Sequence, residues 1–174
     1  TGIKGYGMNL QENIEAVHRM QECIDTHLKE RITLRMLAEA AGYSPWHAAK
    51  IFKELTGKTP FDYIRTLRLS RAAVRLREEE IKVIDVAFDF LFDSHEGFTR
   101  AFSKHFGITP KNYSLHKPPM RFFIPEDVRE KYFCLGKGEG MKKEDSIPNT
   151  TFVQVVKRQE RKLILKRGVK AKDY

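Results

Sequence analysis

Residues 44–63 have the sequence SPWHAAKIFKELTGKTPFDY, and residues 94–113 have the sequence SHEGFTRAFSKHFGITPKNY. When the two segments are aligned at an offset of 50 residues, six positions are identical: Ser44 with Ser94, Phe52 with Phe102, Gly57 with Gly107, Thr59 with Thr109, Pro60 with Pro110 and Tyr63 with Tyr113. This agreement indicates a duplicated supersecondary unit, and two copies are too few for a solenoid.

Each copy is expected to form two short helices joined by a tight turn. The helices are expected to start at caps, which are Thr33, Ser44 and either Asp93 or Ser94, and Pro45 suits a first helical position. Gly42 is placed to end the first helix in the left-handed conformation. Asp93 and Glu96 have the spacing of a capping box. A three-residue turn between short helices is typical of the helix-turn-helix motif, in which the second, recognition helix enters the DNA major groove.

Apolar residues at helical spacing predict which faces are buried. The first helix of the second copy is expected to bury Val83, Ile84, Ala87 and Phe90, and its recognition helix Phe98, Phe102 and Phe106. Between the copies, a helix over about 61–77 has an apolar stripe of Ile64, Leu67, Ala72 and Leu76. At ~1.5 Å per residue this helix is roughly 25 Å long, which suits two recognition helices about one duplex turn, roughly 34 Å, apart.

The net charge of +9 favours a polyanionic partner, although its distribution weakens the signal. Residues 1–118 contain 18 Lys and Arg against 15 Asp and Glu, and residues 119–174 contain 14 against 8. Most of the excess therefore lies outside the repeat. The arginines of the linking helix are either a phosphate-binding face or an ordinary solvated charge run: Arg65, Arg68, Arg71 and Arg75.

The two segments LAEAAGYSPWHAAKIFKELTGKTPFDYIRTLRLSRAAVRL (37–76) and VIDVAFDFLFDSHEGFTRAFSKHFGITPKNY (83–113) resemble the AraC/XylS family of transcription regulators. The resemblance covers residues 10–117 and implies a mainly α, seven-helix bundle with two helix-turn-helix motifs joined by a long linking helix. It places base-facing positions at Trp46, Ala49 and Lys50 in the first recognition helix and at His95, Glu96, Gly97 and Arg100 in the second. Two departures from the family pattern stand out. Family members often have a long polar residue in place of Ala49, and usually glycine in place of Leu91, where a left-handed backbone would strain a leucine.

The chemistry of the base-facing candidates leaves alternatives open. Arg100 can contact guanine O6 and N7 together, or remain an exposed arginine that touches phosphate or nothing; Lys50 has a similar role with less directional chemistry. Trp46 either lies against DNA or props the turn as a half-buried aromatic. Glu96 accepts from cytosine N4 or caps the helix, and His95 donates to DNA or is simply solvated. Ala49 could meet a thymine methyl group.

The remaining segments carry weaker signals. Residues 1–9 are expected to be an appended remnant and a disordered start, and residues 118–150 a linker with at most one short helix. Residues 151–174 have two predicted strands and resemble the opening of a gyrase-inhibitor-like effector-binding domain, which implies an incomplete β segment and a small-molecule effector bound by residues absent here. The alternative for 151–174 is a basic tail that binds DNA non-specifically.

The sequence predicts no enzyme, cofactor, metal site or membrane contact. Cys23 and His27 are four residues apart, but a pair lacks the three or four ligands of a stable zinc site. The expected protein is a cytoplasmic regulator, with RNA polymerase as a partner implied by the family, and it could bind DNA as a monomer. The rivals are a non-specific architectural DNA-binding protein and a regulator-like module of a DNA-repair enzyme with Cys134 as nucleophile, although Cys134 has no nearby base.

Overall fold

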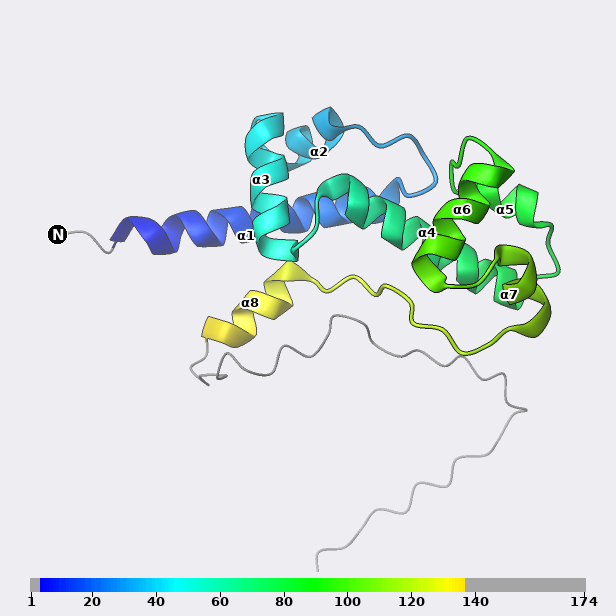
Figure 1. Ribbon diagram of the computed structural model, residues 1–174. Helices are drawn as coiled ribbons and strands as arrows, with labels where there is room; N and C mark the ends of the chain where they lie inside the picture. The colour runs from blue at the N-terminus through cyan, green and yellow to red at the C-terminus, as the bar shows by residue number, and fades with distance from the viewer. Residues whose placement is uncertain (1–3, 137–174) are drawn as a thin grey trace, which may run out of the picture.

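The computed structural model describes residues 4–136, which form eight helices (Figure 1). In chain order they are α1 (Lys4–Thr26), α2 (Leu34–Ala41), α3 (Pro45–Thr56), α4 (Pro60–Glu78), α5 (Val83–Asp89), α6 (His95–Phe106), α7 (Pro110–His116) and α8 (Val128–Gly136). The predicted seven-helix unit is present as α1–α7, so the mainly α class is confirmed. The β segment expected at 151–174 lies outside the described residues. Within 4–136, no helix is both long and apolar enough to cross a bilayer.

The helix boundaries follow from local hydrogen bonds. A Ser or Thr side chain caps five of the helices by accepting a hydrogen bond from the backbone N–H three residues on, and these caps are Thr33, Ser44, Thr59, Ser94 and Thr109. Gly42 ends α2 with a φ of 74°, a left-handed conformation that glycine adopts without steric cost. In the second motif Ser94, one of the two predicted caps, accepts the hydrogen bond from Gly97 N at 3.0 Å, so Ser94 rather than an Asp93–Glu96 capping box starts the helix.

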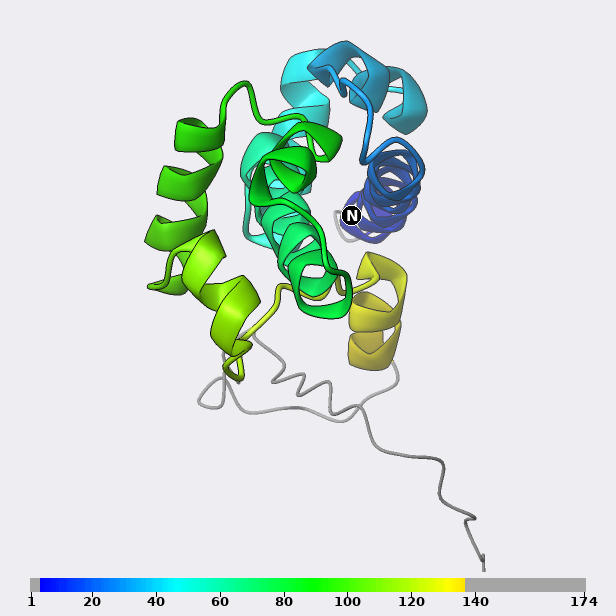
Figure 2. The ribbon, with the colours of Figure 1, turned by 90° about the vertical axis from the view of Figure 1, so that its right-hand side faces the viewer.

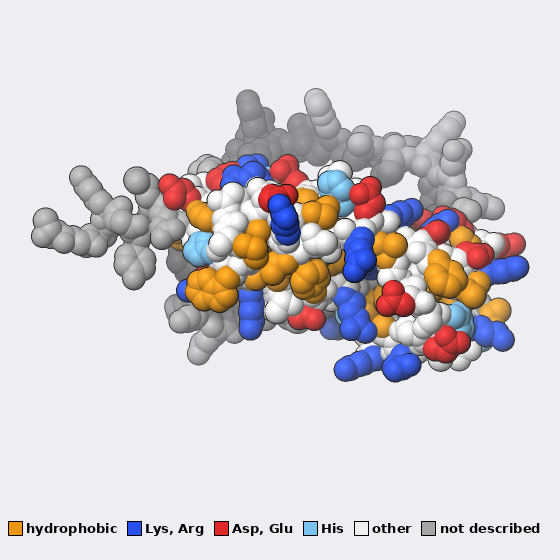
Figure 3. Space-filling view, turned by 90° about the horizontal axis from the view of Figure 1, so that it is seen from above, with side chains coloured by type: hydrophobic (Ala, Val, Ile, Leu, Met, Phe, Trp, Pro, Cys, Tyr) orange, Lys and Arg blue, Asp and Glu red, His pale blue; other side chains and the backbone are white. Residues whose placement is uncertain are grey.

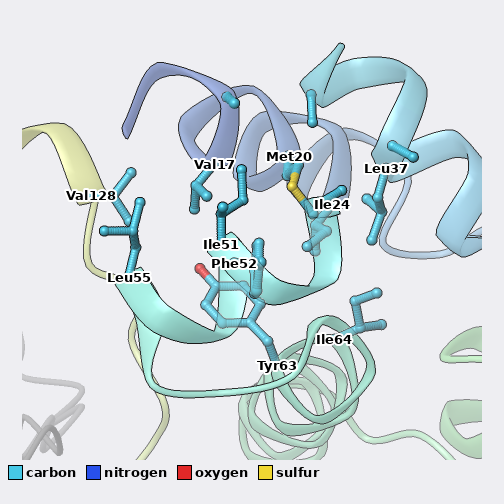
Figure 4. Close-up of a cluster of buried hydrophobic side chains, with 14 of the residues drawn as sticks. Val17, Met20, Ile24, Leu37, Ile51, Phe52, Leu55, Tyr63, Ile64 and Val128 are labelled. Carbon is cyan, nitrogen blue, oxygen red and sulfur yellow. The ribbon is translucent and has the colours of Figure 1, made fainter. Parts of the chain in front are cut away.

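Two hydrophobic clusters form the core, and α4 contributes to both. The first cluster joins α1, α2, α3 and the first half of α4, and it includes Tyr63, Ile64 and Leu67. Figure 4 shows Val17 and Met20 of α1 beside Ile51 of α3 in this cluster. The second cluster joins the rest of α4 to α5, α6 and α7. The predicted stripe on α4 is buried as expected, and it divides between the two clusters at Leu67 and Leu69.

The second motif differs from the first by one extra residue in its turn. The left-handed residue lies two positions before the cap in the first motif (Gly42) and three positions before it in the second (Leu91, φ 59°). Leu91 therefore has the left-handed backbone for which the family usually provides a glycine. The offset between α2 and α5 is therefore 49 residues rather than 50, so Val86 takes the place of buried Leu37. Ile84 is exposed, and its predicted burial is wrong because it falls on the outer face of α5.

Two predictions about the ends of the unit also need correction. Helix α1 begins at Lys4, inside the segment 1–9 that was expected to be disordered, because extending an existing helix costs far less than nucleating one. Residues 118–132, expected to be part of a linker, pack against both clusters: Met120 and Phe122 are buried in the second, and Val128 in the first. Burying these apolar side chains lowers the free energy of the chain, whereas a solvated linker would leave them in water.

Candidate nucleic-acid interface

The two recognition helices, α3 and α6, lie at opposite ends of α4 and present their N-termini on the same side of the molecule. Figures 1 and 2 both show α3 and α6 descending from this side, which is uppermost in the two views. Helix α4 has 19 residues and is therefore ~28 Å long. Two helix N-termini separated by such a rod can face successive turns of one duplex, since these are roughly 34 Å apart.

Arg19 of α1 fixes the turn of the first motif. Its Nε donates to the carbonyl oxygen of Ala40 and its guanidinium NH₂ to that of Ala41, both at 2.8 Å. These carbonyls end α2 and have no partner within the helix. A cation at a helix C-terminus also meets the negative end of the helix dipole. Arg19 thus orients α2 and the start of α3, a role that no local pattern signals because the contact spans 21 residues.

The first recognition helix exposes an aromatic and a cation side by side. Trp46 is 72% exposed, so its alternative role as a half-buried prop is wrong. The Lys50 ammonium lies 5.5 Å from the centre of the Trp46 ring and 3.9 Å from a Glu54 carboxylate oxygen. Both of these exposed interactions are weak, so Lys50 is available to a phosphate or a base. Ala49 is partly buried next to them.

The second recognition helix presents an exposed cation. Arg100 is exposed and makes no hydrogen bond or ion pair with the side chains described in 10–132. Glu96 is exposed in the first turn, and Ser94 rather than Glu96 caps the helix. His95 is partly buried at the helix start. A Cβ on Gly97 would lie 3.1 Å from the Ser94 hydroxyl, so a larger side chain there would disturb the cap.

The linking arginines divide into two kinds. Arg68 donates to the carbonyl oxygens of Leu28 (3.0 Å) and Glu30 (2.7 Å), and burial lowers its pKa. Arg75 pairs with Glu79 and Asp89, whose hydrogen bonds raise its pKa. These two arginines are committed to the fold. Arg65 and Arg71 are exposed and remain candidates for phosphate contact.

The face formed by the recognition-helix N-termini is mixed in character. Figure 3 views it directly and shows Lys and Arg side chains along its length, with exposed hydrophobic side chains and a few carboxylates between them. Cations position a protein on phosphates, whereas apolar and polar groups at the helix starts can meet base edges. The surface therefore has both kinds of group that DNA recognition requires.

The side chains described in 10–132 hold no grouping suited to a metal ion, since no set of three or more His, Cys, Asp or Glu comes together among them. His27, which directly follows α1, has its Nδ1 2.9 Å from the backbone carbonyl oxygen of Cys23 in the last turn of that helix, and 3.9 Å from the Cys23 sulfur. Burial raises the pKa of the Cys23 thiol, which disfavours the reactive thiolate. The side chain of Cys134 lies outside the description.

Comparison with known proteins agrees with this geometry. A family model described as a helix-turn-helix domain matches residues 37–115. The chain is 40% identical over 114 residues to the transcriptional regulator Rob of Salmonella typhimurium, 59% of this chain and 39% of Rob. It is 37% identical over 106 residues to the probable transcription factor PqrA of Proteus vulgaris, and this alignment covers 60% of this chain and 85% of PqrA.

Solved structures show the same fold. An AraC-type regulator from Chromobacterium violaceum superposes with a TM-score of 0.56 at 22% identity, covering 59% of this chain and 91% of that one. The DNA-binding domain of AdpA, crystallised with a target DNA, superposes with a TM-score of 0.55 at 25% identity, covering 58% and 91%. The fold and the paired recognition helices define a helix-turn-helix DNA-binding protein. More narrowly, the chain belongs to the AraC/XylS family of transcription regulators.

Proposed function

We propose that residues 10–117 bind double-stranded DNA in a sequence-specific way, reading two successive major grooves, and that the chain acts in transcription activation. The observation that carries the proposal is the placement of two N-terminal helix ends on one side of the molecule, at the two ends of α4. Their side chains differ: Trp46 and Lys50 in one, Glu96 and Arg100 in the other. Unlike surfaces favour an asymmetric, sequence-selective site over architectural binding.

Each base-facing residue has a distinct role in this proposal. Arg100, which has no partner among the side chains described in 10–132, makes the bidentate contact to guanine, and Lys50 contacts a base or a phosphate. Trp46 lies on the sugar-phosphate backbone or a base edge, and Ala49 meets a thymine methyl group. Glu96 accepts from cytosine N4. His95 and Gly97 lie where α6 comes closest to the DNA, and His95 donates to a phosphate or a base. Arg65 and Arg71 on α4 add phosphate contacts.

The wider role is part of the same proposal. The chain spans 39% of the length of Rob, so the activity of a whole regulator is inferred from its relatives. Because one chain holds both recognition helices, it can occupy two grooves as a monomer. RNA polymerase is the expected partner in activation, in the cytoplasm. Residues 151–174, through their resemblance to an effector-binding domain, support a response to a small molecule.

Selection from randomised duplex DNA, followed by sequencing, tests the function. We expect a bipartite motif with two half-sites about one helical turn apart. Arg100→Ala should cost about 1–3 kcal/mol and relax one position in one half-site. Lys131→Ala removes one exposed positive charge from α8, a helix on the other side of the molecule, and it should leave the motif intact. No enriched motif, with affinity that falls uniformly with salt, would indicate non-specific phosphate binding.

A further inference from the structure

The two helix-turn-helix units share few contacts apart from α4. Helices α1–α3 pack with one another and on the start of α4, whereas α5–α7 pack with one another and on its remainder. On one side the units are separated by an open groove of about 510 Å³, lined by the end of α1, the following loop, α4 and Phe90. The Lys29 ammonium, 5.7 Å from the Phe90 ring centre, approaches across this groove. A single cation–π contact of this kind is weak at an exposed site.

A second connection runs along the opposite side. Residues 118–132, which we call the strap, leave α7, cross α4 and end in α8 against α1 (Figures 1 and 2). Met120 and Phe122 of the strap are 7% and 4% exposed in the second cluster. The next residue, Phe123, packs edge-on against Tyr63 of the first cluster, with ring centres 5.0 Å apart. Two consecutive residues of the strap, Phe122 and Phe123, therefore pack against different units.

Ser70 lies where the strap crosses α4. Its hydroxyl oxygen accepts a hydrogen bond from the Phe123 backbone N–H at 2.9 Å. Ser70 is 3% exposed and is the one polar residue that is fully buried among the side chains described in 10–132. It follows Leu69, the first α4 residue of the second cluster. A buried polar group persists where its hydrogen bond is satisfied, and here that bond ties the strap to the junction of the two units.

Polar contacts fasten the far end of the strap to α1. Gln21 donates to the Glu126 carbonyl oxygen (2.8 Å) and accepts from the Val128 N–H (3.2 Å). Asp127 Oδ1 lies 3.0 Å from His18 Nδ1. Arg129 pairs with Glu15 and holds the pKa of that carboxyl below its usual value. The strap is thus anchored in both units and at the middle of the helix that joins them.

We infer that Ser70 is a positioning residue for DNA recognition: by holding the strap across α4, it fixes the relative placement of α3 and α6 and thereby the spacing of the half-sites that the chain accepts. The inference rests on the proposed function, since it requires two half-sites. The strap and α8 lie on the side of the molecule opposite the N-termini of α3 and α6 (Figure 1), so their influence on DNA is mechanical. When one recognition helix is bound, a stiff connection gives the other a high effective concentration at its half-site for one spacing of the half-sites and a low one for other spacings.

The test compares four duplexes with the full chain and its Ser70→Ala variant: the selected bipartite site, the same site with one base pair inserted between the halves, and each of the two half-sites alone. For the wild-type chain the insertion should weaken binding strongly. In Ser70→Ala the penalty of the insertion should shrink by about fivefold, the factor that one buried hydrogen bond can supply, while the half-sites alone bind as before. Ser103→Ala is the matched control, because its buried hydroxyl has no hydrogen-bond partner.

The outcomes separate the inference from the function. If the wild-type chain selects no bipartite motif, the proposed function fails. If it does, and Ser70→Ala keeps the full insertion penalty, the inference is overturned and the function stands. Should Ser70→Ala not fold, the double variant Asp127→Asn, Arg129→Gln loosens the strap from its exposed end, and it must reduce the same penalty for the inference to survive.

Discussion

Leu91 offers a quantitative test of the backbone of the second motif. Its φ of 59° places a branched residue in the left-handed region, where the equivalent turn residue of the first motif is Gly42. The left-handed conformation costs an L-residue about 1–2 kcal/mol. Glycine avoids that cost, but its greater freedom in the unfolded chain costs about 0.5–1 kcal/mol relative to alanine. Because Leu91→Gly and Leu91→Ala both remove the 42%-exposed side chain, comparing them isolates the backbone.

We expect Leu91→Gly to be more stable than Leu91→Ala by about 1 kcal/mol, the difference between these two effects. For a domain of this size the melting temperatures should differ by about 4 °C. Urea unfolding followed by circular dichroism gives the free energies, and thermal melts give an independent value. Leu91→Gly should remain close to the wild-type stability, since the strain that it relieves offsets the side-chain contacts that it loses.

Glu12 provides the matched control, because it is exposed within α1. There the order should reverse, with glycine less stable than alanine by about 1 kcal/mol, as in any helix interior. If glycine is also the less stable residue at position 91, by a similar margin, the left-handed assignment of Leu91 is refuted, and with it the account of the longer second turn.

Three further predictions concern single side chains. Arg68→Met should lower the free energy of unfolding, measured in urea, by about 2–3 kcal/mol, because it removes two charged hydrogen bonds to carbonyl oxygens of the α1–α2 loop. A loss below about 0.5 kcal/mol, the value expected for replacing a solvated arginine, would contradict this role. Ser94→Ala should cost about 1 kcal/mol and weaken binding at the half-site read by α6, whereas equal weakening at both half-sites would speak against a local cap. Burial raises the pKa of Tyr63 to about 12, opposed by a hydrogen bond from Gln21. The folded state holds the Tyr63 proton more tightly than the unfolded state, in which the tyrosine pKa is about 10. The protonated side chain therefore contributes fully to the free energy of unfolding below pH ~10, and this contribution is lost as the pH rises toward ~12. The free energy of unfolding should therefore fall more steeply over this interval in the wild-type chain than in Tyr63→Phe, and parallel profiles would exclude the effect.

Features that depend on neighbours in the chain could be predicted well. The caps at Thr33 and Ser44 act over three residues, so the residue types and their spacing suffice to locate them. The duplicated segments likewise predicted two motifs and the linking helix. Leu91 was singled out by the family resemblance, because members of the family usually have glycine at this position.

The predictions that failed depended on which of several local options the fold selects. Asp93 and Ser94 both suit a cap, and the choice of Ser94 follows from the longer turn that begins at Leu91. Ile84 has the character of a core residue, but the same extra residue turns Val86 inward in its place. Local chemistry allowed each alternative with similar energy, and packing decided between them.

The sequence alone determined that the motif is duplicated, where most of the helices of the two motifs lie, and which residues stand near the starts of the recognition helices, because each of these depends on interactions over a few residues. The tertiary structure decided how the two motifs are held relative to each other. Arg19 on the end of α2, Arg68 on the α1–α2 loop and Ser70 beneath the strap act across 21, 38 to 40 and 53 residues of chain. Their partners are backbone groups, which every residue carries, so no side-chain pattern could have identified these contacts before the fold brought them together.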